Sequence, residues 1–248
     1  MSLATLLVLA DGRLPAGGHA HSGGLEAAVS AGRVTDLGSL EGFLRGRLAT
    51  SGVVAAAFAA AACAVEKSAK LSDPGALLAP PSTGWGRFGM ASRHADKSWQ
   101  SVLETLDEGL DARTPSPALR RASRAQGRAL LRAGRAMWPI PDVGREPHHP
   151  IALGLLAAAA GLTPRDAATA AAYGSLTGPA TAAVRLLGLD PYGTHALLAA
   201  LAAECDRIAA EAADHAHDPV DDLPADSAPR LDIGAEHHAT WEVRLFAS

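Results

Sequence analysis

The chain has 248 residues and a formal net charge of −4, and 48% of its residues are hydrophobic although only 4% are aromatic. This length permits one large domain with a sizeable core. Most of the hydrophobic residues are alanine and leucine, which favours closely packed helices over a β-sandwich. The negative charge argues against a nucleic-acid-binding protein. Cys63 and Cys205 lie far apart in apolar segments, so we expect reduced, buried thiols.

The N-terminus gives no sign of export. Its first residues, MSLATLLVLAD, lack the basic region and the cleavage site of a signal peptide. The longest uninterrupted apolar run, 53–65, is shorter than the roughly 18–20 residues that cross a bilayer. We therefore expect a cytoplasmic protein without a membrane span.

Apolar spacing and end signals predict the helices of the first half of the chain. Asp11-Gly12 ends the first helix, Gly32 ends the second, and Asp36 caps the third. Gly52 separates the third helix from an alanine-rich fourth. The expected helices are 3–10, 22–32, 36–49 and 53–69.

The second half repeats one start signal three times: a capping side chain directly before a proline. These pairs are Ser116-Pro117, Thr163-Pro164 and Asp190-Pro191, and Gly188 can end the helix that begins at Thr163. Further helices are expected over 85–111 and 149–162. Proline-rich loops are expected over 72–86 and 137–148. No stretch alternates with period two, so we expect an all-α, compact multi-helix bundle.

The segment between the first two helices is a turn-rich loop rich in glycine. Pro15 fixes its own φ, Ser22 can cap the second helix, and Glu26 in the first turn suits the helix dipole. A stiff loop clamped between two helices indicates that something docks there or passes by.

Basic charge is concentrated in one predicted helix. From Arg113 to Arg135 there are seven arginines and no acidic residue. Arg124 and Arg128 belong to a stripe that recurs at helical spacing along one face. This stripe is either a solvated face or a binding face for an acidic protein surface or for the chain's own acidic tail. Nucleic acid fits less well, because the stripe lacks interleaved aromatics.

The composition changes after about residue 217. Residues 1–217 form the expected helical domain, and 218–248 form an acidic, proline-bearing linker with a C-terminal tail that we expect to be flexible. The tail regains apolar bulk at Leu245 and Phe246. It either folds back onto the bundle or docks into a partner groove.

Four pairs of histidines invite a metal interpretation, since imidazole suits zinc, copper and nickel. His19 and His21 are the candidates for a metal contact, but no zinc-type Cys cluster or H-E-x-x-H helix accompanies them. An alternative function is a metal-dependent helical enzyme that uses His19, His21, His148 and His149. No phosphate loop or nucleophile elbow is present, and the paired acids lie in the linker. The pattern favours a binding module.

Five blocks in order resemble the UreF family of urease accessory proteins. They are the D-x-x-x-P-x-G turn with its GLE helix (11–34), LRRASRAQGRALL (119–131), HPIALGLLAAAAGL (149–162), YGSLTGPATAAVRLLGL (173–189) and the terminal RLFAS. By position, Gly24, Leu25 and Glu26 match the GLE element, and Ser123, Gly127 and Arg128 match an S-x-x-x-G-R helix. Tyr173 and Arg185 match the Y…A-V-R-L helix, and Arg244, Leu245 and Phe246 match the terminus.

The resemblance implies an all-helical homodimer without catalysis of its own. It implies an adaptor that bridges a UreD/UreH-type protein and the UreG GTPase, so that nickel reaches apo-urease as GTP is hydrolysed. Nickel would then be handled transiently by the complex, with no tightly bound cofactor or resident metal. The partner-binding residues we expect are Pro15, Gly24, Leu25, Glu26, Arg124, Arg128, Arg244, Leu245 and Phe246.

Overall fold

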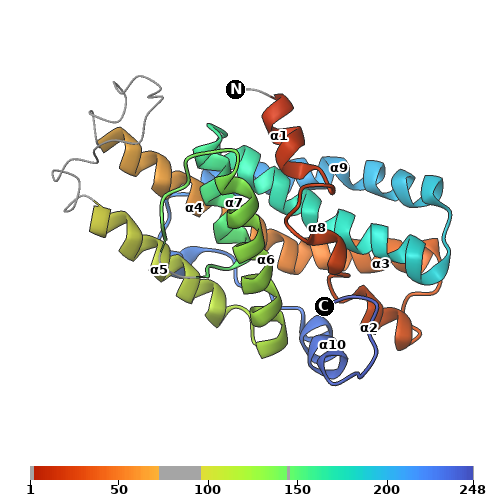
Figure 1. The fold of residues 1–248 in the computed structure, drawn as a ribbon. Coiled ribbons are helices and arrows are strands. Elements are labelled where there is room, and N and C mark those ends of the chain that lie inside the picture. The colour runs from red at the N-terminus through yellow and green to blue at the C-terminus, as the bar shows by residue number, and fades with distance from the viewer. Residues whose placement is uncertain (1–2, 73–95, 144–145, 248) are drawn as a thin grey trace.

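The structure is a computed structural model that describes residues 3–72, 96–143 and 146–247. The described residues are helical with no strand, which confirms the all-α prediction (Figure 1). The elements are α1 (Leu3–Ala10), η1 (Gly18–Ala20), α2 (Leu25–Ser30), α3 (Leu37–Arg47), η2 (Leu48–Gly52), α4 (Val53–Ser72), α5 (Asp96–Ala112), α6 (Pro117–Arg135), α7 (His149–Ala159), α8 (Pro164–Leu187), α9 (Pro191–Asp214), η4 (Val220–Asp222) and α10 (Pro229–Ala239).

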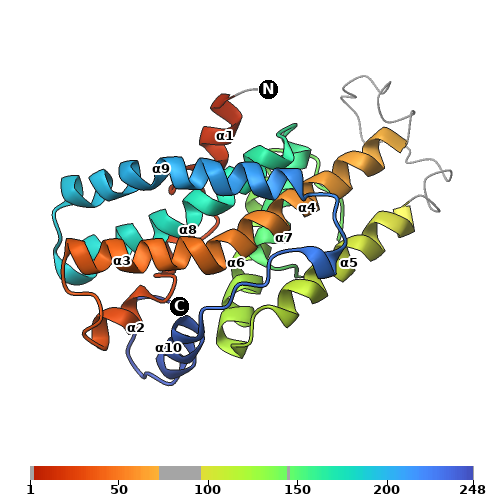
Figure 2. The ribbon, with the colours of Figure 1, turned by 180° about the vertical axis from the view of Figure 1, so that it is seen from behind.

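Helices α4, α7 and α8 form the centre of the bundle. In α4 every residue from Ala56 to Ala64 is buried, and in α7 every residue from Pro150 to Ala158 is buried. α9 lies along α4 and α8, while α5 and α6 cover the other end of the core (Figures 1 and 2). Small side chains allow these helices to approach closely.

Gly154 shows how close the approach of α4 and α7 is. A Cβ atom at this position would overlap the carbonyl oxygen of Ala59 and the Cβ of Ala62. The absent side chain therefore sets the distance between the two central helices.

The apolar composition of the segment 149–162 would suit burial against a second copy of the chain. In the structure α7 is instead covered by α4, α6 and α8 of the same chain. Its composition is therefore no evidence for self-association, because a helix at the centre of one bundle is apolar on all sides.

The predicted helix starts are confirmed by their hydrogen bonds. Ser116 Oγ accepts from Leu119 N at 3.1 Å, and Asp190 accepts from Gly193 N at 2.9 Å. Thr163 and Asp166 form a reciprocal capping box, and so do Asp36 and Ser39. Gly188 ends α8 in the left-handed conformation, with φ of 63°.

The expected break at Gly52 does not occur. A π-helical turn, Leu48–Gly52, joins α3 to α4, so the chain stays helical through the glycine that predicts a break. The resulting run, Leu37–Val65, is long and apolar enough to cross a membrane by length and composition. Its most apolar window is 67% buried by other helices, as in the core helix of a bundle.

The acidic linker is ordered, in contrast to the disorder expected from its composition. It forms η4 and α10, and α10 packs against α2 and α6 (Figure 2). Arg113 explains part of this order, because its guanidinium donates to the carbonyl oxygens of Val220, Leu223 and Pro224. The predicted loop 72–86 and the start of the helix 85–111 lie outside the described residues, and α5 begins at Asp96.

Candidate partner-binding surface

The second helix positions one carboxylate inside the chain. Gly24 precedes α2 in the left-handed conformation, with φ of 89°, and a Cβ there would crowd Leu231 of α10. Ser22 Oγ accepts from Glu26 N at 3.2 Å and so satisfies one free N–H at the start of α2, although Gly24 and not the predicted Ser22 is the N-cap residue. As a result Leu25 is fully buried and Glu26 is only 7% exposed.

Glu26 is the point at which the two ends of the chain meet. Its carboxylate accepts from the backbone N–H of Leu245 at 2.8 Å and from that of Phe246 at 3.1 Å. His238 Nε2 of α10 lies 2.8 Å from the same carboxylate. A buried carboxylate with several donors is well satisfied, and its removal would leave those donors without a partner.

The tail folds back onto the body of the chain. Phe246 is 5% exposed, the Arg185 guanidinium of α8 lies 5.0 Å from its ring centroid, and Ala247 N donates to Ala20 O at 2.7 Å. Of the two alternatives for the tail, the structure shows the fold-back, and Phe246 packs against its own chain. Glu26 accepts hydrogen bonds from the backbone of the tail, and Arg185 makes a cation–π contact with Phe246, so the tail finds both kinds of partner within its own chain.

The same fold-back leaves neighbouring tail residues at the surface. Leu245 is 67% exposed, Val243 is 85% exposed and Arg244 is exposed. Pro15 in the N-terminal loop is exposed as well. The residues expected at this surface therefore fall into two groups. Buried side chains support the surface from below, and these are Leu25, Glu26 and Phe246. Exposed side chains face solvent, and these are Pro15, Arg244 and Leu245.

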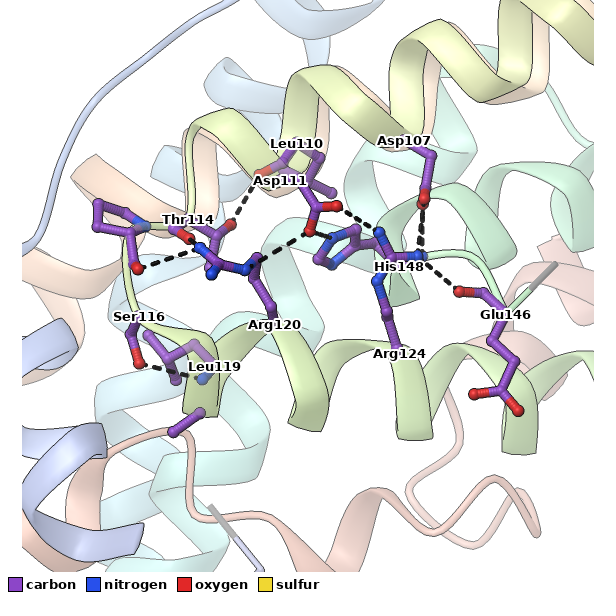
Figure 3. A network of polar contacts seen from close by, with 12 residues as sticks. Asp107, Leu110, Asp111, Thr114, Ser116, Leu119, Arg120, Arg124, Glu146 and His148 are labelled. Atoms are coloured by element: carbon purple, nitrogen blue, oxygen red, sulfur yellow. Dashed lines mark hydrogen bonds and ion pairs between the residues drawn. The ribbon is translucent and has the colours of Figure 1, made fainter.

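Arg124 on α6 belongs to a polar network between α5 and α6 (Figure 3). Its guanidinium contacts Asp107 at 2.7 Å and Asp111 at 2.6 Å, and donates to Glu146 O at 2.7 Å. Asp107 is buried, so this arginine neutralises a carboxylate inside the fold. Arg124 therefore has a structural role, and its guanidinium has little hydrogen-bonding capacity left for a partner.

His148 completes this network. Its ring Nε2 lies 2.8 Å from Asp111 Oδ1, and its backbone N–H donates to Asp107 Oδ1 at 2.8 Å. Burial lowers the pKa of the His148 imidazole, against the opposing effect of Asp111. Burial would raise the pKa of Asp111, but hydrogen bonds from His148 and Arg124 lower it overall. At neutral pH we therefore expect a neutral imidazole beside a charged carboxylate.

The remainder of the arginine stripe is more exposed. Arg128 pairs with Glu146 at 2.5 Å, with both side chains 55% exposed, and Arg135 lies 3.7 Å from Asp142. Exposed pairs of this kind contribute little to stability and can exchange partners. The stripe expected to meet an acidic surface thus already meets carboxylates of its own chain, mainly from α5 and the loop before α7.

The histidines expected to contact metal do not gather into a metal site. Burial lowers the pKa of His21, and burial together with the nearby His21 lowers the pKa of His149 to about 4. Within residues 3–72, 96–143 and 146–247, no group of three or more His, Cys, Asp or Glu side chains could hold a metal ion. His148 is engaged with Asp111, so no observation favours the alternative of a metal-dependent enzyme.

Sequence reasoning missed two residues that hold this surface together. His238 lies in the segment 218–248, which we expected to be a flexible linker and tail, but it is 4% exposed and lies against Glu26. Arg47 was not singled out, yet its guanidinium donates to Ser175 O and Gly23 O, and burial lowers its pKa to about 10. Both lie in ordinary polar positions of amphipathic helices, and only the tertiary fold shows their partners.

Comparison with known proteins gives one consistent result. The UreF family model matches residues 34–202. A urease accessory protein UreF of Mycobacterium sp. (strain JLS) is 44% identical over 251 residues, which cover 100% of this chain and 99% of the relative. UreF of Mycolicibacterium vanbaalenii is 44% identical over 250 residues with the same coverage. UreF of Mycobacterium tuberculosis H37Rv is 37% identical over 250 residues, again with the same coverage. These relatives extend over both ends of the chain, where Glu26 and Phe246 meet.

Proposed function

The chain belongs to the UreF family of urease accessory proteins, and we propose that it is the adaptor that joins the other accessory proteins during urease maturation. It is an accessory protein and not itself an enzyme. In the proposed complex it bridges a UreD/UreH-type protein and the UreG GTPase, and the complex delivers nickel to apo-urease as UreG hydrolyses GTP. The observation that carries the proposal is the similarity to UreF proteins over the full length of the chain.

The joined ends supply the binding surface in this proposal. Glu26 fixes the backbone of Leu245 and Phe246, and this holds the exposed Arg244 and Leu245 in a defined place. A preorganised tail loses less conformational entropy on binding than a disordered one. Exposed apolar side chains near an arginine are typical of an interface centre.

The remaining parts of the proposal concern assembly, metal and location. We propose a cytoplasmic homodimer that handles nickel transiently, with His19 and His21 as the side chains that meet it. His19 is exposed on the N-terminal loop. Leu3 and Leu7 of α1 are 71% and 63% exposed, which leaves an apolar helix face available to a second chain.

Reconstitution of urease activation tests the proposal. Apo-urease is incubated with nickel, GTP, UreG and the UreD/UreH-type protein, with and without this chain, and urease activity is measured. The adaptor role predicts that activation and co-elution of UreG with the UreD/UreH-type protein both require the chain. Equal activation without it would contradict the proposal.

A further inference from the structure

A second surface lies on the face of α3 that is turned toward α10. A cavity of about 630 Å³ opens between these helices, and we name it the α3–α10 groove. Its apolar lining includes Val34, Phe43 and Leu231. This volume is in the range of binding pockets for side chains and small ligands.

Three arginines line the groove, and no Asp or Glu does so among the described residues. They are Arg33 after α2, Arg47 of α3 and Arg230 of α10. Arg47 is engaged with two backbone carbonyls. Arg33 and Arg230 are exposed, and neither forms an ion pair within the part of the chain that the structure describes. The groove therefore carries uncompensated positive charge at its rim.

Two glycines in α3 keep the groove open. Gly42 and Gly46 lie one helical turn apart, both line the groove, and a Cβ at either position would meet no atom within 4 Å. Glycine inside a helix is less stable than alanine, and nothing in the fold needs these two side chains to be absent. The space over α3 is thus empty within one chain, and the backbone is open to close approach from outside.

The distribution of charge decides the kind of occupant. A small anion would need its charge matched at the bottom of the cavity, but Arg47 there already donates to Ser175 O and Gly23 O. The arginines that remain available lie at the exposed rim, while buried Val34 and partly buried Phe43 provide the apolar depth. An acidic peptide segment fits this arrangement, with carboxylates at the rim and an apolar side chain inside.

We propose that the α3–α10 groove binds an acidic segment of a protein partner, which inserts an apolar side chain beside Phe43 and pairs its carboxylates with Arg33 and Arg230. This inference rests on the proposed adaptor function, because it requires a partner protein. It assigns that partner a second contact, separate from the exposed tail residues Arg244 and Leu245.

The test measures affinity for the UreD/UreH-type protein and for UreG, using the full-length chain. The variant Arg33→Glu/Arg230→Glu reverses the rim charge, and Arg165→Glu/Arg207→Glu makes the same change at exposed positions away from both the groove and the arginine stripe. We expect the first variant to bind one partner at least tenfold more weakly, with a weaker salt dependence, and the control to bind as wild type.

A second pair of variants tests the shape of the groove without changing its charge. Gly46→Leu fills the groove, whereas Gly38→Leu adds the same side chain to exposed α3 surface outside it. We expect Gly46→Leu to lower the affinity for the same partner at least tenfold, and Gly38→Leu to leave that affinity within twofold of wild type. Circular dichroism and thermal melting identify any variant that has lost its fold.

The outcomes separate this inference from the function on which it rests. If wild type binds no accessory partner, the adaptor function fails and the inference falls with it. If wild type binds and all groove variants bind equally, only the inference is overturned. It is also overturned if the groove variants change only the monomer–dimer equilibrium in sedimentation, or only the binding of hexanoate in calorimetry, since the occupant is then a second copy or a small anion.

Discussion

The carboxylate of Glu26 accepts from the backbone N–H of Phe246 at 3.1 Å, so a residue of the second helix fixes the third residue from the end of a 248-residue chain. The same carboxylate holds Leu245 N and faces His238. This contact explains why the GLE element and the terminal R-L-F segment belong to one surface although they are far apart in sequence.

Replacing Glu26 by alanine should release the tail. The substitution removes the acceptor for two backbone donors and for the buried His238, and we expect a loss of about 1–3 kcal/mol in unfolding free energy. Hydrogen exchange should become faster at Leu245 and Phe246 while α4 and α8 stay protected. Unchanged exchange at the tail would show that Glu26 does not hold it.

Phe246→Ala and Leu245→Ala form a matched pair of adjacent truncations. Phe246 is 5% exposed and contacts Arg185, so its loss should cost about 2–4 kcal/mol. Leu245 is 67% exposed, so its truncation should stay within about 0.5 kcal/mol. Chemical denaturation measures both, and equal effects would argue against the fold-back.

Arg124→Ala should destabilise the bundle, because it leaves the buried Asp107 without its cation. We expect the free energy of unfolding to fall by about 2–3 kcal/mol. This is less than for a fully buried ion pair, because the Arg124 side chain is 28% exposed. Arg132→Ala on the same helix removes an exposed arginine and should change stability by less than about 0.5 kcal/mol. If Arg124→Ala left the free energy of unfolding unchanged, Arg124 would instead have a purely surface role.

Acid should weaken the fold through the partly buried His149. The pKa of His149 is lowered to about 4, so the neutral ring contributes stability that is complete above the unfolded-state pKa near 6.5. That contribution, about 3 kcal/mol, is lost as the pH falls from about 6.5 toward 4. His149→Gln should flatten the pH dependence of the unfolding free energy in this window. A slope identical to wild type would contradict the assignment.

Two glycine-to-alanine substitutions should act in opposite directions. Gly154→Ala places a Cβ against Ala59 O and should destabilise by about 2–3 kcal/mol. Gly42→Ala meets open space in α3 and should stabilise by up to about 1 kcal/mol. Thermal melting of the two variants beside wild type gives the comparison, and equal shifts would mean that the packing around Gly154 is looser than described.

Local signals predicted most of the fold, because helix starts and ends depend on residues that are adjacent in the sequence. The caps at Ser116, Thr163 and Asp190 are recognisable from two or three residues, and the structure has them. The helix α10 was missed, since its order depends on packing against α2 and on contacts that Arg113 makes with the preceding segment, far away in the sequence.

The structure brings Glu26 and the segment 244–246 together, but the sequence did not show how they are arranged. Glu26, Arg244, Leu245 and Phe246 were all singled out, yet only the tertiary structure shows which of them face inward. Composition cannot distinguish a C-terminal tail that stays solvated from one that folds back, because a single buried acceptor such as Glu26 decides between them.

The central claim is that Glu26 holds the tail so that its exposed residues meet a partner, and one binding measurement tests it most directly. The affinity of the full-length chain for the UreD/UreH-type protein is compared for wild type and for Arg244→Ala/Leu245→Ala, which removes only exposed side chains. The account predicts unchanged melting of the variant and an affinity at least tenfold lower. An unchanged melting temperature together with wild-type affinity would contradict it.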